Sequence, residues 1–203
     1  MERTVNIFKN YTENKVFIET GSYKGDGIEK ALEAGFDKII SIEITPEYYE
    51  LCVEKFKDNE NVKIYLGDSV KLLSDILNDI NEPVVLWLDA HYTEPTTLYG
   101  DKMCPVLDEI NIIKEHAKKY NDIILIDDMR CWTEDNFNYQ NYLFNNDDIK
   151  NKLKEIDLNV ELSLDYGCIP DDVLVAKYNH DVKEEVKNNT KKSVKKTSKT
   201  KKR

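Results

Sequence analysis

The sequence predicts an α/β protein with a mostly parallel sheet and helices on both faces. Two observations carry this prediction. From residue 15 onward, short runs rich in β-branched residues alternate with longer runs of helical spacing. The runs VVLWL at residues 84–88 and IILI at residues 123–126 are almost continuously apolar, which is typical of strands buried on both faces.

The first half of the chain predicts three strands that alternate with three helices. The strands are expected at residues 16–19, 38–44 and 62–66, and the helices at residues 27–34, 47–56 and 70–80. Gly35 suits the C-terminal cap of the first helix. Pro46 suits the first turn of the second helix, and Asp68 or Ser69 suits the N-terminal cap of the third.

The second half begins with the apolar strand at residues 84–88. After a loop, Pro105 opens a predicted helix over residues 106–120, and the apolar strand at residues 123–126 follows. A helix near residues 148–156 and strands near residues 160–164 and 173–176 complete a pattern that has no internal repeat.

Charge divides the chain unevenly. Residues 186–203 hold nine Lys or Arg and no acid, although the whole chain has a formal net charge of −10. We therefore expect a lead-in over residues 1–14, one folded domain over residues 15–180 and a disordered Lys-rich tail over residues 181–203. The tail could contact nucleic acid, an anionic membrane or a partner, but a solubilising role is the favoured interpretation. The acidic body argues against a nucleic-acid-binding core.

The sequence also bears on cellular location. It has no apolar run of the ~18 residues that a membrane span needs, and its first residues do not resemble a signal peptide. Its four cysteines are dispersed without a CxxC pair, which favours reduced thiols over a zinc or disulfide framework. We expect a cytoplasmic protein, in the host cytoplasm if the chain is viral.

Carboxylates follow five successive predicted strands, as Glu19, Glu43, Asp68, Asp89 and the Asp127–Asp128 pair. The carboxyl ends of parallel strands meet at one edge of a sheet, where ligands bind. A glycine-rich turn in ETGSYKGDG, residues 19–27, would let a ligand approach the backbone closely. The dinucleotide fingerprint G-x-G-x-x-G is absent, and a pyrophosphate would be repelled. S-adenosylmethionine (SAM) has a sulfonium, an amino group and no phosphate, so it suits these carboxylates.

These motifs resemble those of class I SAM-dependent methyltransferases over roughly residues 15–178. ETGSYKGDG resembles the first motif of that family, although Ser22-Tyr23-Lys24 stand where a middle glycine is common. The resemblance implies a Rossmann-like, doubly wound, seven-stranded sheet. It implies that Glu43 takes the ribose hydroxyls and that LGDS, residues 66–69, contacts adenine. The cofactor-binding residues expected from this resemblance are Glu19, Gly21, Ser22, Gly25, Glu43, Asp68, Ser69 and Asp89.

WLDAHYTEPT at residues 87–96 and LIDDMR at residues 125–130 resemble a narrower group. These segments are similar to metal-dependent macrocin-type sugar O-methyltransferases and to methyltransferase domains of viral glycan-building proteins. The resemblance implies that Asp89, Asp127 and Asp128 hold Mg²⁺ or Mn²⁺ and that a sugar or glycan hydroxyl accepts the methyl group. The general base would be Asp89 or His91, where His91 replaces an acid that is common in the group. Catechol-type methyltransferases use a similar set of three carboxylates.

Each of these residues also has a plainer interpretation. Asp68 can serve as a helix cap, the Asp127–Asp128 pair can form a turn, and His91 can be an ordinary loop histidine. Aromatic residues in the loops after the fourth and fifth strands could stack on a ligand or pack the loops onto the body; they are Tyr92, Tyr99, Trp132, Phe137, Tyr139 and Tyr142. Candidate acceptor contacts are Thr96, Thr97 and Arg130.

Two other functional classes stay open. One is a catalytically silent methyltransferase fold that acts as a scaffold. The other is a protein or nucleic-acid methyltransferase that recruits its substrate through the basic tail. The segment DAHY, residues 89–92, lacks the Asn/Asp-Pro-Pro-Tyr/Phe motif expected of a DNA amino-methyltransferase.

Overall fold

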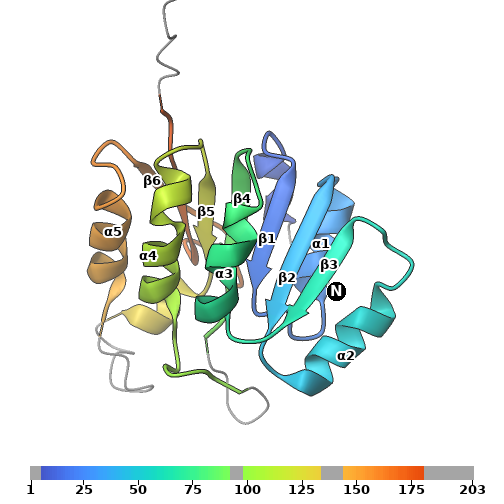
Figure 1. Cartoon of the computed structure of the whole chain (residues 1–203). Helices are drawn as coiled ribbons and strands as arrows, with labels where there is room; N and C mark the ends of the chain where they lie inside the picture. Colours follow the sequence, from blue (N-terminus) through green and yellow to red (C-terminus); the bar gives the residue numbers. More distant parts are fainter. Residues whose placement is uncertain (1–5, 92–97, 134–143, 181–203) are drawn as a thin grey trace, which may run out of the picture.

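A computed structural model describes residues 6–91, 98–133 and 144–180 of the chain. Its central feature is a seven-stranded sheet in the order β3-β2-β1-β4-β5-β7-β6 (Figure 1). The strands are β1 (Val16–Thr20), β2 (Lys38–Glu43), β3 (Val62–Leu66), β4 (Val84–Leu88), β5 (Ile123–Ile126), β6 (Glu161–Asp165) and β7 (Val173–Lys177). The α-helices are α1 (Asp26–Ala34), α2 (Pro46–Lys55), α3 (Ser69–Asn78), α4 (Val106–Ala117) and α5 (Asn146–Lys154).

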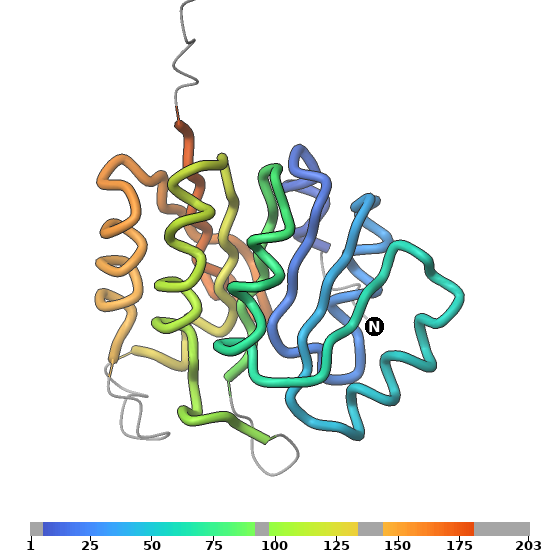
Figure 2. The backbone as a smooth tube through the Cα atoms, viewed as in Figure 1, coloured from blue at the N-terminus to red at the C-terminus, as the bar shows by residue number. Residues whose placement is uncertain are grey.

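The sheet is mostly parallel, as the sequence predicts. Strands β1 to β5 run in parallel, and Ile18 of β1 pairs with Ile40 of β2 and with Leu86 of β4. Strand β7 is antiparallel to both of its neighbours, β5 and β6. From β1 the chain adds β2 and β3 on one side, and from β4 it adds β5 on the other side, then β6 at the edge and β7 between β5 and β6 (Figure 2). The strand order therefore reverses between β1 and β4, where ligands bind in doubly wound sheets.

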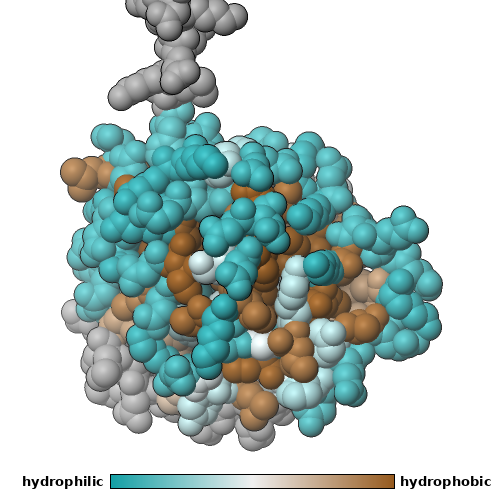
Figure 3. All heavy atoms as spheres, in the orientation of Figure 1, coloured by the Kyte–Doolittle hydropathy of each residue, from teal (hydrophilic) through white to brown (hydrophobic). Residues whose placement is uncertain are grey.

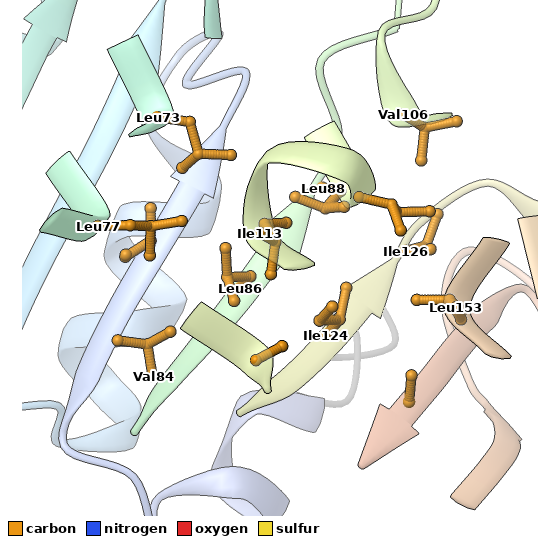
Figure 4. Packing of buried hydrophobic residues seen from close by; sticks show 14 of the residues in the cluster. Leu73, Leu77, Val84, Leu86, Leu88, Val106, Ile113, Ile124, Ile126 and Leu153 are labelled. Atoms are coloured by element: carbon orange, nitrogen blue, oxygen red, sulfur yellow. The ribbon is translucent and has the colours of Figure 1, made fainter. Parts of the chain in front are cut away.

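Helices cover both faces of the sheet, and each face has its own core. Helices α3, α4 and α5 pack on one face, where Leu86, Ile124 and Leu153 lie among the buried side chains (Figure 4). Helices α1 and α2 pack on the other face, over residues such as Phe17, Val85 and Leu125. The alternation of side chains along β4 and β5 supplies both cores, which explains why these strands are apolar without interruption.

The helix boundaries follow the expected capping residues. Gly35 closes α1 with a φ of 90°, a left-handed conformation in which its N–H reaches the carbonyl oxygens of Ala31 and Leu32. Pro46 lies in the first turn of α2. Asp68 caps α3, because its side chain accepts a hydrogen bond from the backbone N–H of Val70.

Part of the expected lead-in belongs to the core. Residues Ile7–Tyr11 form a 3-10 helix, η1, in which Ile7, Phe8 and Tyr11 are buried. Phe8 packs against Phe17 of β1 and Trp87 of β4, with ring centroids 4.8 and 4.9 Å apart. A second 3-10 helix, η2 (Met129–Trp132), follows β5. Neither element has enough residues to give a periodic signal in the sequence.

No helix among the described residues is both long enough and apolar enough to cross a membrane. All four cysteines are free. On the face that carries α3 and α4, hydrophilic side chains form most of the rim, and hydrophobic side chains show between the helices (Figure 3).

Candidate active site

A cavity of about 670 Å³ opens at the carboxyl ends of β1 to β5. Residues at or just after the ends of these five strands line the cavity. The cavity therefore lies at the edge of the sheet that the sequence predicts for ligand binding. The predicted site residues in its wall are Gly21, Glu43, Asp68, Ser69, Asp89, His91, Asp127 and Asp128. Its size falls in the range of small-molecule and cofactor sites, about 300–1,000 Å³.

Gly21 fixes the close contact between the ends of β1 and β4. Its φ is 88°, and a Cβ built there would lie 2.5 Å from the backbone oxygen of Asp89. Its N–H donates to the carbonyl oxygen of Ile42 at 2.9 Å. The position therefore needs glycine for its backbone conformation and for space.

Glu19 does not line the cavity. Its side chain is almost fully buried, and one carboxyl oxygen accepts a hydrogen bond from Ser41 at 2.5 Å. A Cβ on Gly27 would lie 1.7 Å from the other oxygen, so this glycine makes room for the carboxyl at the start of α1. Burial raises the pKa of Glu19 to about 8, and the charges of Asp89 and Glu43 add to the shift.

Ser22 and Gly25 also lie outside the cavity wall. The Ser22 hydroxyl is 2.5 Å from that of Ser41 and extends the buried network of Glu19. Gly25 has a φ of 84°, and a Cβ there would lie 2.5 Å from the Phe56 ring. Both residues support the turn between β1 and α1 from outside the cavity. Their predicted contacts with the cofactor stay predictions.

Glu43 ends β2 at the cavity wall, with little of its side chain exposed. Its two carboxyl oxygens accept backbone N–H groups of Tyr23 at 2.8 Å and of Thr45 at 2.7 Å. These bonds hold the carboxylate in one orientation. Each oxygen keeps a further acceptor site, which is what two ribose hydroxyls would require.

Asp68 and Ser69 follow β3 and line the same cavity. Asp68 combines its capping bond to Val70 with an ion pair to Lys71 at 3.4 Å. A Cβ on Gly100 would lie 2.4 Å from one Asp68 oxygen, so the segment after residue 98 passes directly over this carboxylate. The capping role and a ligand role are compatible here.

His91 bridges two carboxylates on the opposite side of the cavity. Its Nε2 lies 2.9 Å from Asp128 Oδ2, and its Nδ1 lies 3.4 Å from Asp89 Oδ1. Burial disfavours the imidazolium, but the bond to Asp128 and the charge of Asp89 outweigh burial and raise the pKa of His91. Burial, together with the charges of Asp127 and Asp128, raises the pKa of Asp89.

Asp127 and Asp128 occupy different electrostatic environments. Burial and the neighbouring Asp128 charge raise the pKa of Asp127 to about 6. Burial would also raise the pKa of Asp128, but the bond to His91 and the charges of His91 and Arg130 lower it. Asp128 has a φ of 61°, and Arg130 Nη1 lies 2.5 Å from its Oδ1.

Asp172 lies next to these residues and has no motif that marks it in the sequence. It is almost fully buried before β7, and its carboxylate accepts the Arg130 guanidinium and the backbone N–H of Cys168. Its carbonyl oxygen accepts the N–H of Met129 at 2.9 Å. Asp172 thus attaches the turn before β7 to η2.

Other residues of the wall were not predicted as site residues. Tyr23, Leu98, Gly100, Asp101, Lys102 and Asp108 all line the cavity. Asp108 lies in the first turn of α4, and the others come from irregular segments, where periodicity carries no signal. The proximity of Gly100 to Asp68 depends on tertiary structure. Among the earlier candidates, Tyr99 and Arg130 line the cavity. Tyr92, Thr96, Thr97, Phe137, Tyr139 and Tyr142 lie outside the described residues.

Comparisons with known proteins identify the fold. No protein family and no curated protein sequence matches the chain. An SAH-bound methyltransferase of Podospora anserina superposes with a TM-score of 0.55 at 16% identity, over 85% of this chain and 75% of that chain. An O-methyltransferase of Bacillus cereus in complex with SAH superposes with a TM-score of 0.55 at 11% identity, over 86% of this chain and 80% of that chain. The chain therefore has the Rossmann-like fold of these methyltransferases.

Proposed function

We propose that this chain is a SAM-dependent O-methyltransferase that methylates a hydroxyl of a sugar or glycan, assisted by Mg²⁺ or Mn²⁺. The observation that carries the proposal is the set of carboxylates that the ends of four strands, β2 to β5, bring around one cavity. Carboxylates attract the sulfonium and amino groups of SAM. The SAH-bound structures with the same fold support this choice of cofactor.

Cofactor binding would use the β1–β3 side of the cavity. Glu43 is held in place by the N–H groups of Tyr23 and Thr45, so its free acceptor sites face the ligand without reorganisation. Asp68 would accept from the adenine amine, and Gly21 would keep the backbone close to the methionine portion. Glu19, Ser22 and Gly25 would support cofactor binding indirectly, by shaping the turn between β1 and α1.

The acceptor would occupy the β4–β5 side. Asp89 and His91 are the predicted candidates for taking a proton from an acceptor hydroxyl, and both line the cavity. The contacts of His91 with Asp89 and Asp128 would fix its imidazole ring relative to the bound acceptor. Much of the catalysis would come from this positioning, since methyl transfer needs the two reacting atoms held in line.

A divalent ion fits the donor chemistry of this side. Asp89, Asp127 and Asp128 line one cavity and offer the oxygen ligands that Mg²⁺ and Mn²⁺ prefer. Tighter groupings also occur: the donor atoms of His91, Asp128 and Cys131 lie within 4.8 Å of one another, as do those of Asp128, Cys168 and Asp172. A bound ion would lower the pKa of the acceptor hydroxyl.

The charge of the cavity favours an acceptor without phosphate. Its wall contains seven acidic residues, and its two strongly basic residues are already paired, Lys102 with Asp108 and Arg130 with Asp128. The sequences of residues 92–97 and 134–143 contain no Lys or Arg. An anionic acceptor would meet repulsion at this wall, whereas a sugar hydroxyl would not.

Calorimetric titration with SAM, with and without Mg²⁺, tests the proposal. We expect micromolar-range binding to the wild type, weaker by about 10-fold or more in Glu43→Gln and in Glu43→Ala, because hydrogen bonds to a charged group are lost. The matched control is Glu47→Ala, an exposed acid on α2. Thermal melts of each variant report folding separately. No binding to the folded wild type would refute the enzyme and favour a scaffold.

Two further measurements address the ion and the tail. Titration with Mg²⁺ alone should give a saturable binding heat with the wild type and a much smaller one with Asp127→Asn; equal heats would refute the proposed metal site. Deletion of residues 181–203 should leave methylation of small glycan acceptors unchanged. Loss of activity in the deletion variant would favour the protein or nucleic-acid methyltransferase instead.

A further inference from the structure

A small cavity of about 10 Å³ adjoins the large one, and Ala90, His91 and Pro105 line both. Glu109 of α4 and Trp132 of η2 line the small cavity, and both are almost fully buried. Glu109 Oε1 and Trp132 Nε1 have no hydrogen-bond partner among the described residues. One is an acceptor and the other a donor, and they belong to residues that line the same cavity.

Two unsatisfied buried polar atoms are costly, by about 1–3 kcal/mol each. A void of about 10–15 Å³ holds one water molecule when polar partners surround it. We propose that a single buried water occupies this void, accepts a hydrogen bond from Trp132 Nε1 and donates one to Glu109 Oε1. The site takes water because both walls supply polar atoms, unlike the dry cavities of apolar cores.

The water would connect the two sides of the large cavity. The Glu109 carboxyl lies beside the hydroxyls of Ser69 and Thr20, and Ser69, the first residue of α3, lines the large cavity. The Trp132 ring meets the His91 ring edge-on, with centroids 6.2 Å apart and an interplanar angle of 82°. Trp132 is therefore a positioning residue for His91, and this second statement rests on the proposed function.

A high-resolution crystal structure of the full chain tests the water directly. We expect one ordered water within hydrogen-bond distance of both Glu109 Oε1 and Trp132 Nε1. An empty void, or a direct bond between the two side chains, would overturn the proposal. Neither outcome depends on whether the protein is a methyltransferase.

A double-mutant cycle gives a second test. Glu109→Met and Trp132→Phe each leave one polar atom without the water bridge, so the double variant should lose less thermal stability than the two single losses together. The control pair is Glu109→Met with Trp87→Phe, because Trp87 lies in the core on the other face of the sheet. Those losses should add. Equal additivity in both cycles would refute the bridge.

Kinetics test the positioning role. Trp132→Phe should lower kcat by about 10-fold, since a small displacement of a reacting group is costly, while KM for the acceptor and SAM affinity stay close to wild type. A rise in KM with unchanged kcat would assign Trp132 to acceptor binding instead. If the wild type shows no methylation at all, the proposed function fails while the water site stands on the crystallographic and stability results.

Discussion

His91 joins the ends of β4 and β5 by placing its two ring nitrogens against different carboxylates, Nε2 2.9 Å from Asp128 and Nδ1 3.4 Å from Asp89. The bridge makes three residues behave as one ionic unit, in which a change at any member alters the proton affinity of the others. Arg130 extends the unit by pairing with Asp128 and Asp172.

The first prediction concerns this bridge. His91→Asn should lower kcat by at least about 100-fold, because the variant loses the proton acceptor and its fixed geometry. SAM affinity should change little, since Glu43 and Asp68 lie on the other side of the cavity. The control is His180→Asn, a histidine whose ring reaches Ala117 O and not the cavity. Full activity in His91→Asn would remove His91 from the mechanism.

Two glycines with the same backbone conformation provide a matched comparison. Gly21 and Gly35 have φ values of 88° and 90°, but a Cβ at Gly35 meets nothing within 4 Å, whereas one at Gly21 meets the Asp89 backbone. Gly35→Ala should cost about 1–2 kcal/mol from its left-handed conformation and leave SAM binding intact. Gly21→Ala should cost more and weaken SAM binding. Equal effects in melts and calorimetry would show that the Gly21 contact is unimportant.

The buried Glu19 predicts a pH dependence of stability. Its pKa rises from 4.5 to about 8 on folding, so between these values the folded protein holds a proton that the unfolded chain has lost. The contribution of Glu19 to the free energy of unfolding is complete below about pH 4.5 and is lost as pH rises to about 8. The loss is at most about 1.4 kcal/mol per pH unit. Glu19→Gln should flatten the decline seen in urea denaturation. Parallel profiles for both proteins would contradict the burial argument.

The Asp172 carboxylate predicts a structural loss at the edge of the site. Asp172→Asn keeps the shape but removes the charge that faces Arg130, and it should lower the free energy of unfolding by about 1.5–3 kcal/mol. The exposed pair of Asp147 and Lys150 provides the control, and Asp147→Asn should leave the urea midpoint nearly unchanged. A negligible effect of Asp172→Asn would mean that backbone bonds alone hold the turn.

The sequence predicted most of the sheet because its signals are local. The apolar runs of β4 and β5, the Gly35 cap and the Asp68 cap each follow from a few neighbouring residues. The antiparallel insertion of β7 between β5 and β6 could not be predicted, since strand direction leaves no trace in side-chain alternation. The 3-10 helix η1 is too short to show a hydrophobic periodicity, so its burial could not be predicted either.

The candidate site, like the fold, could be predicted only in part. Strand order brings Glu43, Asp68 and Asp89 to one edge, and the sequence showed each at a strand end. Glu19 was expected at the same edge, but its carboxyl lies under the turn against Gly27. Gly27 thus makes room for the Glu19 side chain and not for a ligand. The contact of His91 with Asp128 and the void beside Glu109 depend on tertiary packing, which residue spacing does not encode.

The burial of η1 has a consequence for the order of events during synthesis. The Tyr11 hydroxyl donates to Asp165 at 2.6 Å, and Phe8 shares a core with Val173 and Val175. Chains leave the ribosome from the N-terminus, so Phe8 emerges long before these partners. Phe8 can meet Phe17 and Trp87 once β1 and β4 have formed, but Tyr11 must wait for Asp165 until the β6–β7 hairpin has emerged and docked. The native contacts of residues 7–11 are therefore complete only when this hairpin is in place.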